Sequence, residues 1–107
     1  MIKVIFYRSD NRISGYEISG HAECGDEGND IICASVSSAA YMTTNTLSEI
    51  IKCQLDADVS AGYMSIKVKT RLSDAQQILE GLRLHLEALA ADYPNNIKVT
   101  LRRCQNA

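Results

Sequence analysis

The chain has no long apolar run, no dense cluster of basic residues and no CxxC cysteine pair. Its apolar N-terminal stretch, residues 1–6, is soon followed by Arg8 and Asp10, so we predict neither a signal peptide nor a membrane span. Lysines and arginines are scattered apart from the pair Arg102 and Arg103, and the formal net charge is -2. Because the sequence has no cluster of basic residues that could bind a phosphate backbone, we predict no direct nucleic-acid binding.

These absences favour a cytoplasmic location. In a reducing compartment, the four cysteines are expected to be thiols, ligands or nucleophiles rather than structural bridges. With 107 residues, 46% hydrophobic and 22% charged, the chain has ordinary globular composition and enough length for one core. No repeat, linker or low-complexity segment interrupts it, so we predict a single domain spanning residues 1–107.

Alternating apolar and polar residues predict two β-hairpins. The first covers residues 2–19 around a polar turn at 9–12, and the second covers residues 55–68 around Ala61 and Gly62. Glycine permits the positive φ that a tight turn needs. A last alternating run, residues 97–102, predicts a strand with one covered face.

Two amphipathic helices are predicted between these strands. From Asp30 onward, apolar residues recur every three or four positions as far as Ile51, and Asp30 is a plausible N-cap. Ser73 followed by Gln76 forms a capping-box pattern that opens a second helix, which ends at the turn 93–96. The order ββαββαβ predicts an α+β two-layer sandwich, with two helices on one face of an antiparallel or mixed sheet.

Cys33 and His21 are the residues with the clearest chemical potential. If Asp30 is the N-cap, Cys33 occupies the first helical turn, where unpaired N–H groups and the helix dipole favour a thiolate and could stabilise an oxyanion. His21 precedes Cys33 by a Gly-rich loop long enough to fold back and place an imidazole beside the sulfur. This pairing suits a nucleophile and its base. Asp30 has a second possible role, orienting His21 through a hydrogen bond.

Two sequence blocks support a family resemblance: Gly20-His21-Ala22, and the run from Gly28-Asn29-Asp30 through Cys33 to Ser37. They resemble the GHA and G-x-D-[IV]-[VI]-C-A-A-V-S signatures of the ribosomal-processing cysteine protease family, Prp. The resemblance extends over essentially the whole chain. Ser35 departs from the usual alanine, and Cys24 is an additional thiol in the loop.

The resemblance implies an endopeptidase that removes the short N-terminal extension of a large-subunit ribosomal protein, number twenty-seven, after an aromatic residue. It implies that His21 and Cys33 are catalytic and that Asp30 and Ser37 support them, with no metal or other cofactor. Gly20, Ala22 and Gly28 would belong to the substrate loop, whose glycines let a peptide approach closely. Members of this family form homodimers, so a homodimer is expected.

Other readings of the same residues remain open. Without the resemblance, Cys33 could be a small buried apolar residue, and His21 could be a solvated surface residue. His21, Cys24 and Cys33 could also ligate zinc, although the paired chelate and a fourth ligand are missing. The alternative function is therefore a non-catalytic, ribosome-associated binding module with a structural or metal-binding His/Cys loop.

Overall fold

The computed structural model describes residues 1–20 and 27–104, with the backbone alone at 27–30. Its elements follow the predicted ββαββαβ order, with a short π-helical segment after the first helix. They are β1 (Ile2–Ser9), β2 (Arg12–Ser19), α1 (Glu27–Asn45), η1 (Thr46–Ile50), β3 (Leu55–Ser60), β4 (Tyr63–Val68), α2 (Leu72–Asp92) and β5 (Ile97–Arg103).

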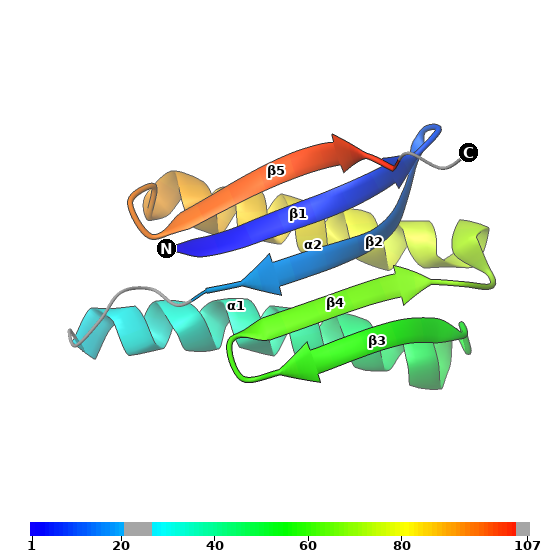
Figure 1. The fold of residues 1–107 in the computed structure, drawn as a ribbon, viewed down its shortest axis with the longest axis horizontal. Coiled ribbons are helices and arrows are strands. Elements are labelled where there is room, and N and C mark those ends of the chain that lie inside the picture. The colour runs from blue at the N-terminus through cyan, green and yellow to red at the C-terminus, as the bar shows by residue number, and fades with distance from the viewer. Residues whose placement is uncertain (21–26, 105–107) are drawn as a thin grey trace.

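The five strands form one mixed sheet in the order β3-β4-β2-β1-β5. Both hairpins are antiparallel, as is the β2–β4 pair, whereas β1 and β5 run parallel. Both helices lie behind the sheet in Figure 1, so they cover the same face. The α+β two-layer prediction is confirmed, and the parallel β1–β5 pair makes the sheet mixed.

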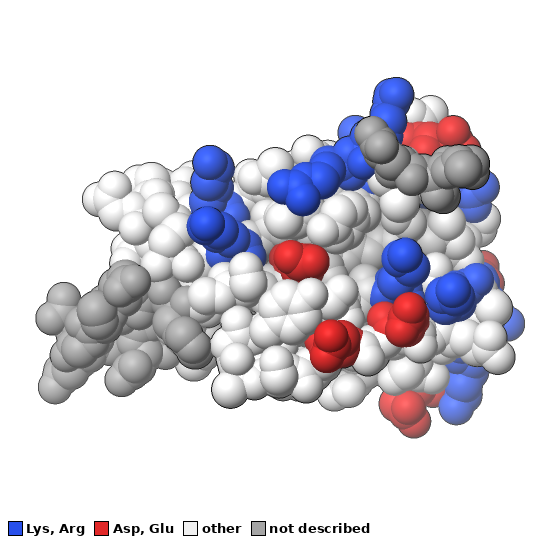
Figure 2. Space-filling model, viewed as in Figure 1, with Lys and Arg blue, Asp and Glu red and all other residues white. Residues whose placement is uncertain are grey.

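The core lies between the sheet and the helices. Alternate residues along the strands face inward and meet the apolar stripes of α1 and α2. Several of these side chains are completely buried, among them Val4, Phe6, Tyr16, Leu79 and Leu86. The opposite face of the sheet carries charged side chains of both signs, as Figure 2 shows, and no helix of the described residues covers it in Figure 1. This one-sided burial explains the alternation in the strands.

The first helix differs from the prediction at both ends. It begins at Glu27, so Asp30 lies inside the helix and is not its N-cap. Acidic residues are favoured near the positive end of a helix dipole, so Glu27 and Asp30 suit this earlier start. After Asn45 the chain forms a π-turn, closed by the Ile51 N–H on the Thr46 carbonyl at 2.9 Å. The wider turn changes which residues face the core, and Ile50 is 74% exposed.

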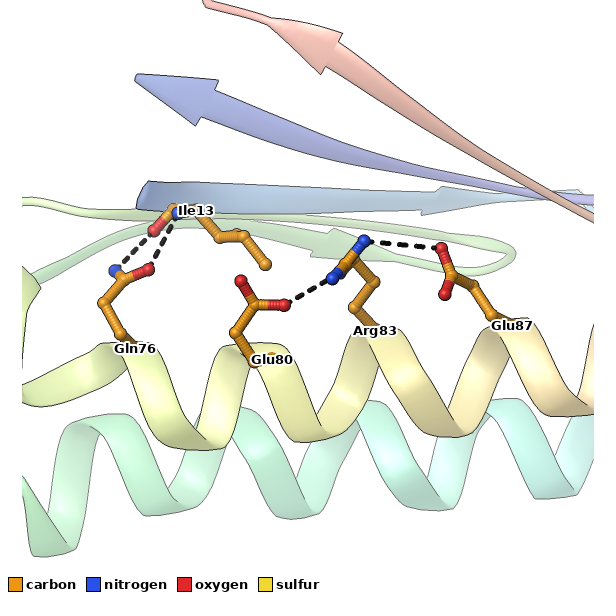
Figure 3. Close-up of polar contacts among 5 residues, drawn as sticks. All are labelled: Ile13, Gln76, Glu80, Arg83 and Glu87. Carbon is orange, nitrogen blue, oxygen red and sulfur yellow. Dashed lines mark hydrogen bonds and ion pairs between the residues drawn. The ribbon is translucent and has the colours of Figure 1, made fainter. Parts of the chain in front are cut away.

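The capping-box prediction for the second helix is wrong. The N-cap is Arg71 in the left-handed conformation, with no side-chain cap hydrogen bond. Gln76 instead contacts the sheet: the Ile13 N–H donates to its Oε1 at 2.8 Å, and its Nε2 donates to the Ile13 carbonyl at 2.9 Å. Figure 3 shows this pair beside the exposed Glu80–Arg83 ion pair. Gln76 therefore fixes the α2–sheet contact rather than the helix end.

The predicted turn of the second hairpin is confirmed. Gly62 has φ +71, which glycine adopts without steric cost, and it connects β3 to β4. Within the described ranges, no helix has the length and apolar character needed to cross a lipid bilayer.

Candidate active site

A hollow of about 140 Å³ lies beside Cys33, between α1 and the end of the sheet where β2 stops and β4 begins. We call it the Cys33 hollow. Its walls come from both layers and from the turn of the second hairpin. They are Ile2, Ile18, Gly20, Cys33, Val36, Ser37, Ala40, Tyr41, Ser60, Gly62, Tyr63 and Met64.

Helix α1 supplies one wall of this hollow through its periodicity. Cys33, Ser37 and Tyr41 are spaced by four residues, so they follow one another along the same helix face. Cys33 is half-buried and packs against the core, whereas Ser37 and Tyr41 are exposed. A nucleophilic sulfur at such a position borders both a sheltered space and solvent.

The position of Cys33 in the helix requires a correction. Because α1 begins at Glu27, Cys33 lies in the second turn and not in the first. The unpaired N–H groups of a helix belong to its first turn, and the dipole effect falls off beyond it. The described helix therefore gives no support to the prediction that first-turn amides beside Cys33 hold an oxyanion.

Gly20 brings the start of the predicted catalytic loop to the same hollow. Its N–H donates to the Gly62 carbonyl at 3.0 Å, and its φ of +88 is a conformation that other residues rarely adopt. A Cβ at this position would lie 2.4 Å from the Met1 carbonyl oxygen. His21 follows Gly20 directly in the chain, and its own position lies outside the described residues.

The structure brings together three of the predicted site residues: Gly20, Cys33 and Ser37. Gly28 and Asp30 lie in the first turn of α1, where only the backbone is described. Ala22 and Cys24 lie outside the described residues, as His21 does. The predicted pairing of His21 with Cys33 thus remains a prediction.

Sequence analysis missed several residues of the hollow, including Ala40, Gly62 and Tyr63. The four-residue spacing from Cys33 through Ser37 could have identified Tyr41. Val36 and Ala40 directly precede Ser37 and Tyr41 and line the hollow beside them. Gly62 and Tyr63 had no such signal, because their place beside Cys33 depends on the pairing of β4 with β2.

The inner part of α1 is fixed to the sheet by a buried tyrosine. The Tyr16 hydroxyl donates to the Ala40 carbonyl at 3.4 Å and lies 2.5 Å from the Thr44 hydroxyl. Burial raises the pKa of Tyr16 to about 12, so the hydroxyl stays protonated and can donate well above neutral pH. This contact holds the helix segment that lines the hollow.

The other described cysteines differ from Cys33. Cys53 is buried, and desolvation raises the pKa of its thiol. Cys104 is half-buried and follows β5. Neither lines the Cys33 hollow. Across residues 1–20 and 27–104, no three His, Cys, Asp or Glu side chains gather as metal ligands, but the zinc reading depends on His21 and Cys24, which fall outside those ranges.

Comparison with known proteins gives the family. Residues 1–98 match the family described as cysteine protease Prp. The chain is 30% identical over 108 residues to the ribosomal processing cysteine protease Prp of Bacillus subtilis, covering 94% of this chain and 96% of that protein. A protein of the same name from Staphylococcus aureus is 25% identical over 101 residues, covering 92% and 95%.

Solved structures give the same fold. A Streptococcus mutans protein matches with a TM-score of 0.83 and 28% identity, over 97% of this chain and 96% of that one. The ribosomal processing protease Prp of Staphylococcus aureus, solved with a covalently linked product peptide, matches with a TM-score of 0.85 and 24% identity, over 95% of this chain and 100% of that one. The chain therefore belongs to the cysteine protease Prp family.

Proposed function

We propose that this protein is an endopeptidase that removes the short N-terminal extension of large-subunit ribosomal protein number twenty-seven, cutting after an aromatic residue. Its membership of a cysteine protease family and the ribosomal processing role in the names of its relatives support this proposal. A Staphylococcus aureus relative has also been solved with a substrate peptide. Processing of the extension would support ribosome maturation.

The observation that carries the proposal is the shared lining of the Cys33 hollow. Gly20 and Cys33 both border it, and His21 is covalently attached to Gly20. The hydrogen bond from Gly20 to Gly62 fixes the chain one residue before the imidazole. This tether to the rim on which Cys33 lies supports the choice of His21 as the base.

In the proposed reaction, His21 takes the proton of the Cys33 thiol and the sulfur attacks the peptide carbonyl. The C–N bond then breaks, the leaving amine takes the proton from His21, and an acyl-enzyme remains on the sulfur. Water, deprotonated by His21, hydrolyses the thioester and releases the new carboxyl terminus. This sequence uses no cofactor.

The remaining site residues have supporting roles in this proposal. Since Asp30 is not the N-cap, its proposed role is to accept a hydrogen bond from His21 and fix the imidazole tautomer. Ser37 lies one turn after Cys33 on the wall of the hollow, and its proposed role is to contact the peptide there. Gly20 and Ala22 belong to the segment that receives the substrate, and Gly28 follows that segment in the first turn of α1.

We also propose that the enzyme is a cytoplasmic homodimer. Ile31 and Met42 are 68% and 55% exposed, and their separation of eleven residues places them on the same outer face of α1. Ile50, at the end of η1, is also exposed. Burying these side chains against a second copy would remove apolar surface from water.

The test uses a peptide that spans the extension junction, with cleavage followed by mass spectrometry. We expect Cys33→Ala to abolish cleavage and His21→Ala to lower kcat at least about 100-fold, as expected for loss of a general base. Cys104→Ala is the matched control and should cleave normally. Binding of the peptide by Cys33→Ala should persist.

Three outcomes would contradict the proposal. Full activity of Cys33→Ala would show that Cys33 is not the nucleophile. A reduced, metal-free wild-type protein that binds the peptide without cleaving it would favour a binding module. If the wild-type enzyme cleaves other peptides but not this one, the endopeptidase activity would be supported and the proposed substrate would be wrong.

A further inference from the structure

The inner wall of the Cys33 hollow is apolar. Ile2, Val36, Ala40 and Met64 line it, and each is at most 6% exposed. Ser37, Tyr41 and Ser60 are exposed and lie at its mouth. A space with an apolar interior and a polar rim suits an apolar side chain whose backbone stays at the rim.

The volume of the hollow indicates the size of that side chain. At about 140 Å³ it is far larger than the space of one water molecule. An apolar cavity of about 150 Å³ in another protein accepts benzene. The Cys33 hollow therefore has room for one phenyl-sized group, and not for two large side chains.

Ala40 lies at the end of the hollow away from the sulfur. It follows Cys33 by seven positions, which corresponds to about 10 Å along the helix axis. A peptide carbonyl held at the sulfur and an aromatic side chain extending from the adjacent Cα span a similar length. The methyl group of Ala40 is therefore placed where the tip of such a side chain would end.

We infer that Ala40 is the specificity-determining residue that sets how large a side chain is accepted immediately before the scissile bond. The inference rests on the proposed function, because it takes Cys33 as the nucleophile. Ala40 cannot move aside easily, since its carbonyl accepts hydrogen bonds from Tyr16 and from Thr44, at 3.4 and 2.9 Å. A larger residue at position 40 would fill the hollow instead.

The experiment measures inhibition by N-acetyl amino aldehydes with phenylalanine, leucine, valine or alanine side chains. Each aldehyde carbon bonds to the cysteine sulfur, the aldehyde oxygen takes the thiol proton, and nothing leaves. We expect the wild type to bind the phenylalanine aldehyde at least about tenfold tighter than the alanine aldehyde. Ala40→Val adds two methyl groups, so it should weaken the phenylalanine aldehyde at least about tenfold, the lower end of the range for a single methylene in an apolar pocket, and leave the alanine aldehyde nearly unchanged.

Ala88→Val is the matched control, because Ala88 lies in the other helix and is exposed. It should preserve the wild-type order of affinities. If Ala40→Val does not fold by circular dichroism, Met64→Ala carries the test by enlarging the hollow. That variant should improve the affinity for a naphthylalanine aldehyde relative to phenylalanine.

Equal affinity for the four aldehydes in the wild type would overturn the inference, as would an equal loss for all four in Ala40→Val. An unchanged ratio in a folded Met64→Ala would do the same. These results are distinct from failure of the proposed function, which appears as loss of junction-peptide cleavage while the aldehydes still discriminate by size.

Discussion

Gly20 donates its backbone N–H to the Gly62 carbonyl at 3.0 Å, and this bond joins the end of β2 to the turn of the second hairpin. The two glycines are far apart in sequence and both have positive φ. Both also line the Cys33 hollow. One backbone contact therefore sets the rim of the candidate site at the residue that precedes His21 in the sequence.

Replacing Gly20 with alanine should disturb this rim. The new Cβ would be forced into a positive φ and against the Met1 carbonyl oxygen, and we expect a loss of about 1–3 kcal/mol in the free energy of unfolding. The rate of junction-peptide cleavage should also fall, because the proposed base His21 follows Gly20 directly in the chain. Urea denaturation and junction-peptide cleavage would measure both effects.

Gly81→Ala is the matched control for that experiment. Gly81 lies in the interior of α2, and a Cβ there meets nothing within 4 Å. Removing a helical glycine should raise the free energy of unfolding by about 0.5–1 kcal/mol and leave activity unchanged. If Gly20→Ala were as stable and active as Gly81→Ala, the anchoring role of Gly20 would be wrong.

Alkaline pH should destabilise the protein partly through Tyr16. Its folded pKa of about 12 lies above the unfolded value of 10.0, so its contribution is complete below pH 10 and is lost as the pH rises toward 12. The loss should be about 2–3 kcal/mol. Denaturant titrations at a series of pH values would follow it.

Tyr16→Phe separates this contribution from that of other groups, since burial also raises the pKa of Cys53. At pH 7 the variant should lose about 1 kcal/mol with the hydrogen bond to the Ala40 carbonyl. Between pH 10 and 12 its stability should fall less steeply than that of the wild type. Identical slopes for the two proteins would argue against the raised pKa.

Gln76→Leu should lower the free energy of unfolding by about 1–3 kcal/mol, because the N–H and carbonyl of Ile13 lose their partner. Gln77→Leu is the matched control at an exposed position of the same helix, where a change within about 0.5 kcal/mol is expected. Thermal or urea unfolding would compare the two. Equal effects would mean that the amide contacts of Gln76 contribute nothing specific.

The cysteines should differ in their rate of alkylation by iodoacetamide. Cys53 is 6% exposed and burial raises its pKa, so little reactive thiolate is accessible at pH 8. We expect Cys53 to be modified last, after Cys33 and Cys104. Peptide mass spectrometry over a time course would give the order, and early modification of Cys53 would show that it is not buried in solution.

Much of the fold follows from local patterns in the sequence. Alternation predicted the strands, and the three-to-four-residue spacing predicted the helices, because each element has one covered face. The stripe formed by Val36, Ala40 and Leu47 is buried as predicted. The helix ends were not predicted well, because capping patterns compete with tertiary contacts. Gln76 binds the backbone of Ile13 rather than closing a capping box.

The sequence alone determined the family resemblance, the order of the elements and the candidate pair His21 and Cys33. These features depend on local residue types and their spacing. The tertiary structure decided that Gly20, Cys33 and Gly62 share one hollow, and that Ala40 also lines it. Such neighbours come from the pairing of β4 with β2 and from the packing of α1 on the sheet. The free energy of burial fixes those contacts between distant segments, and no local pattern specifies them.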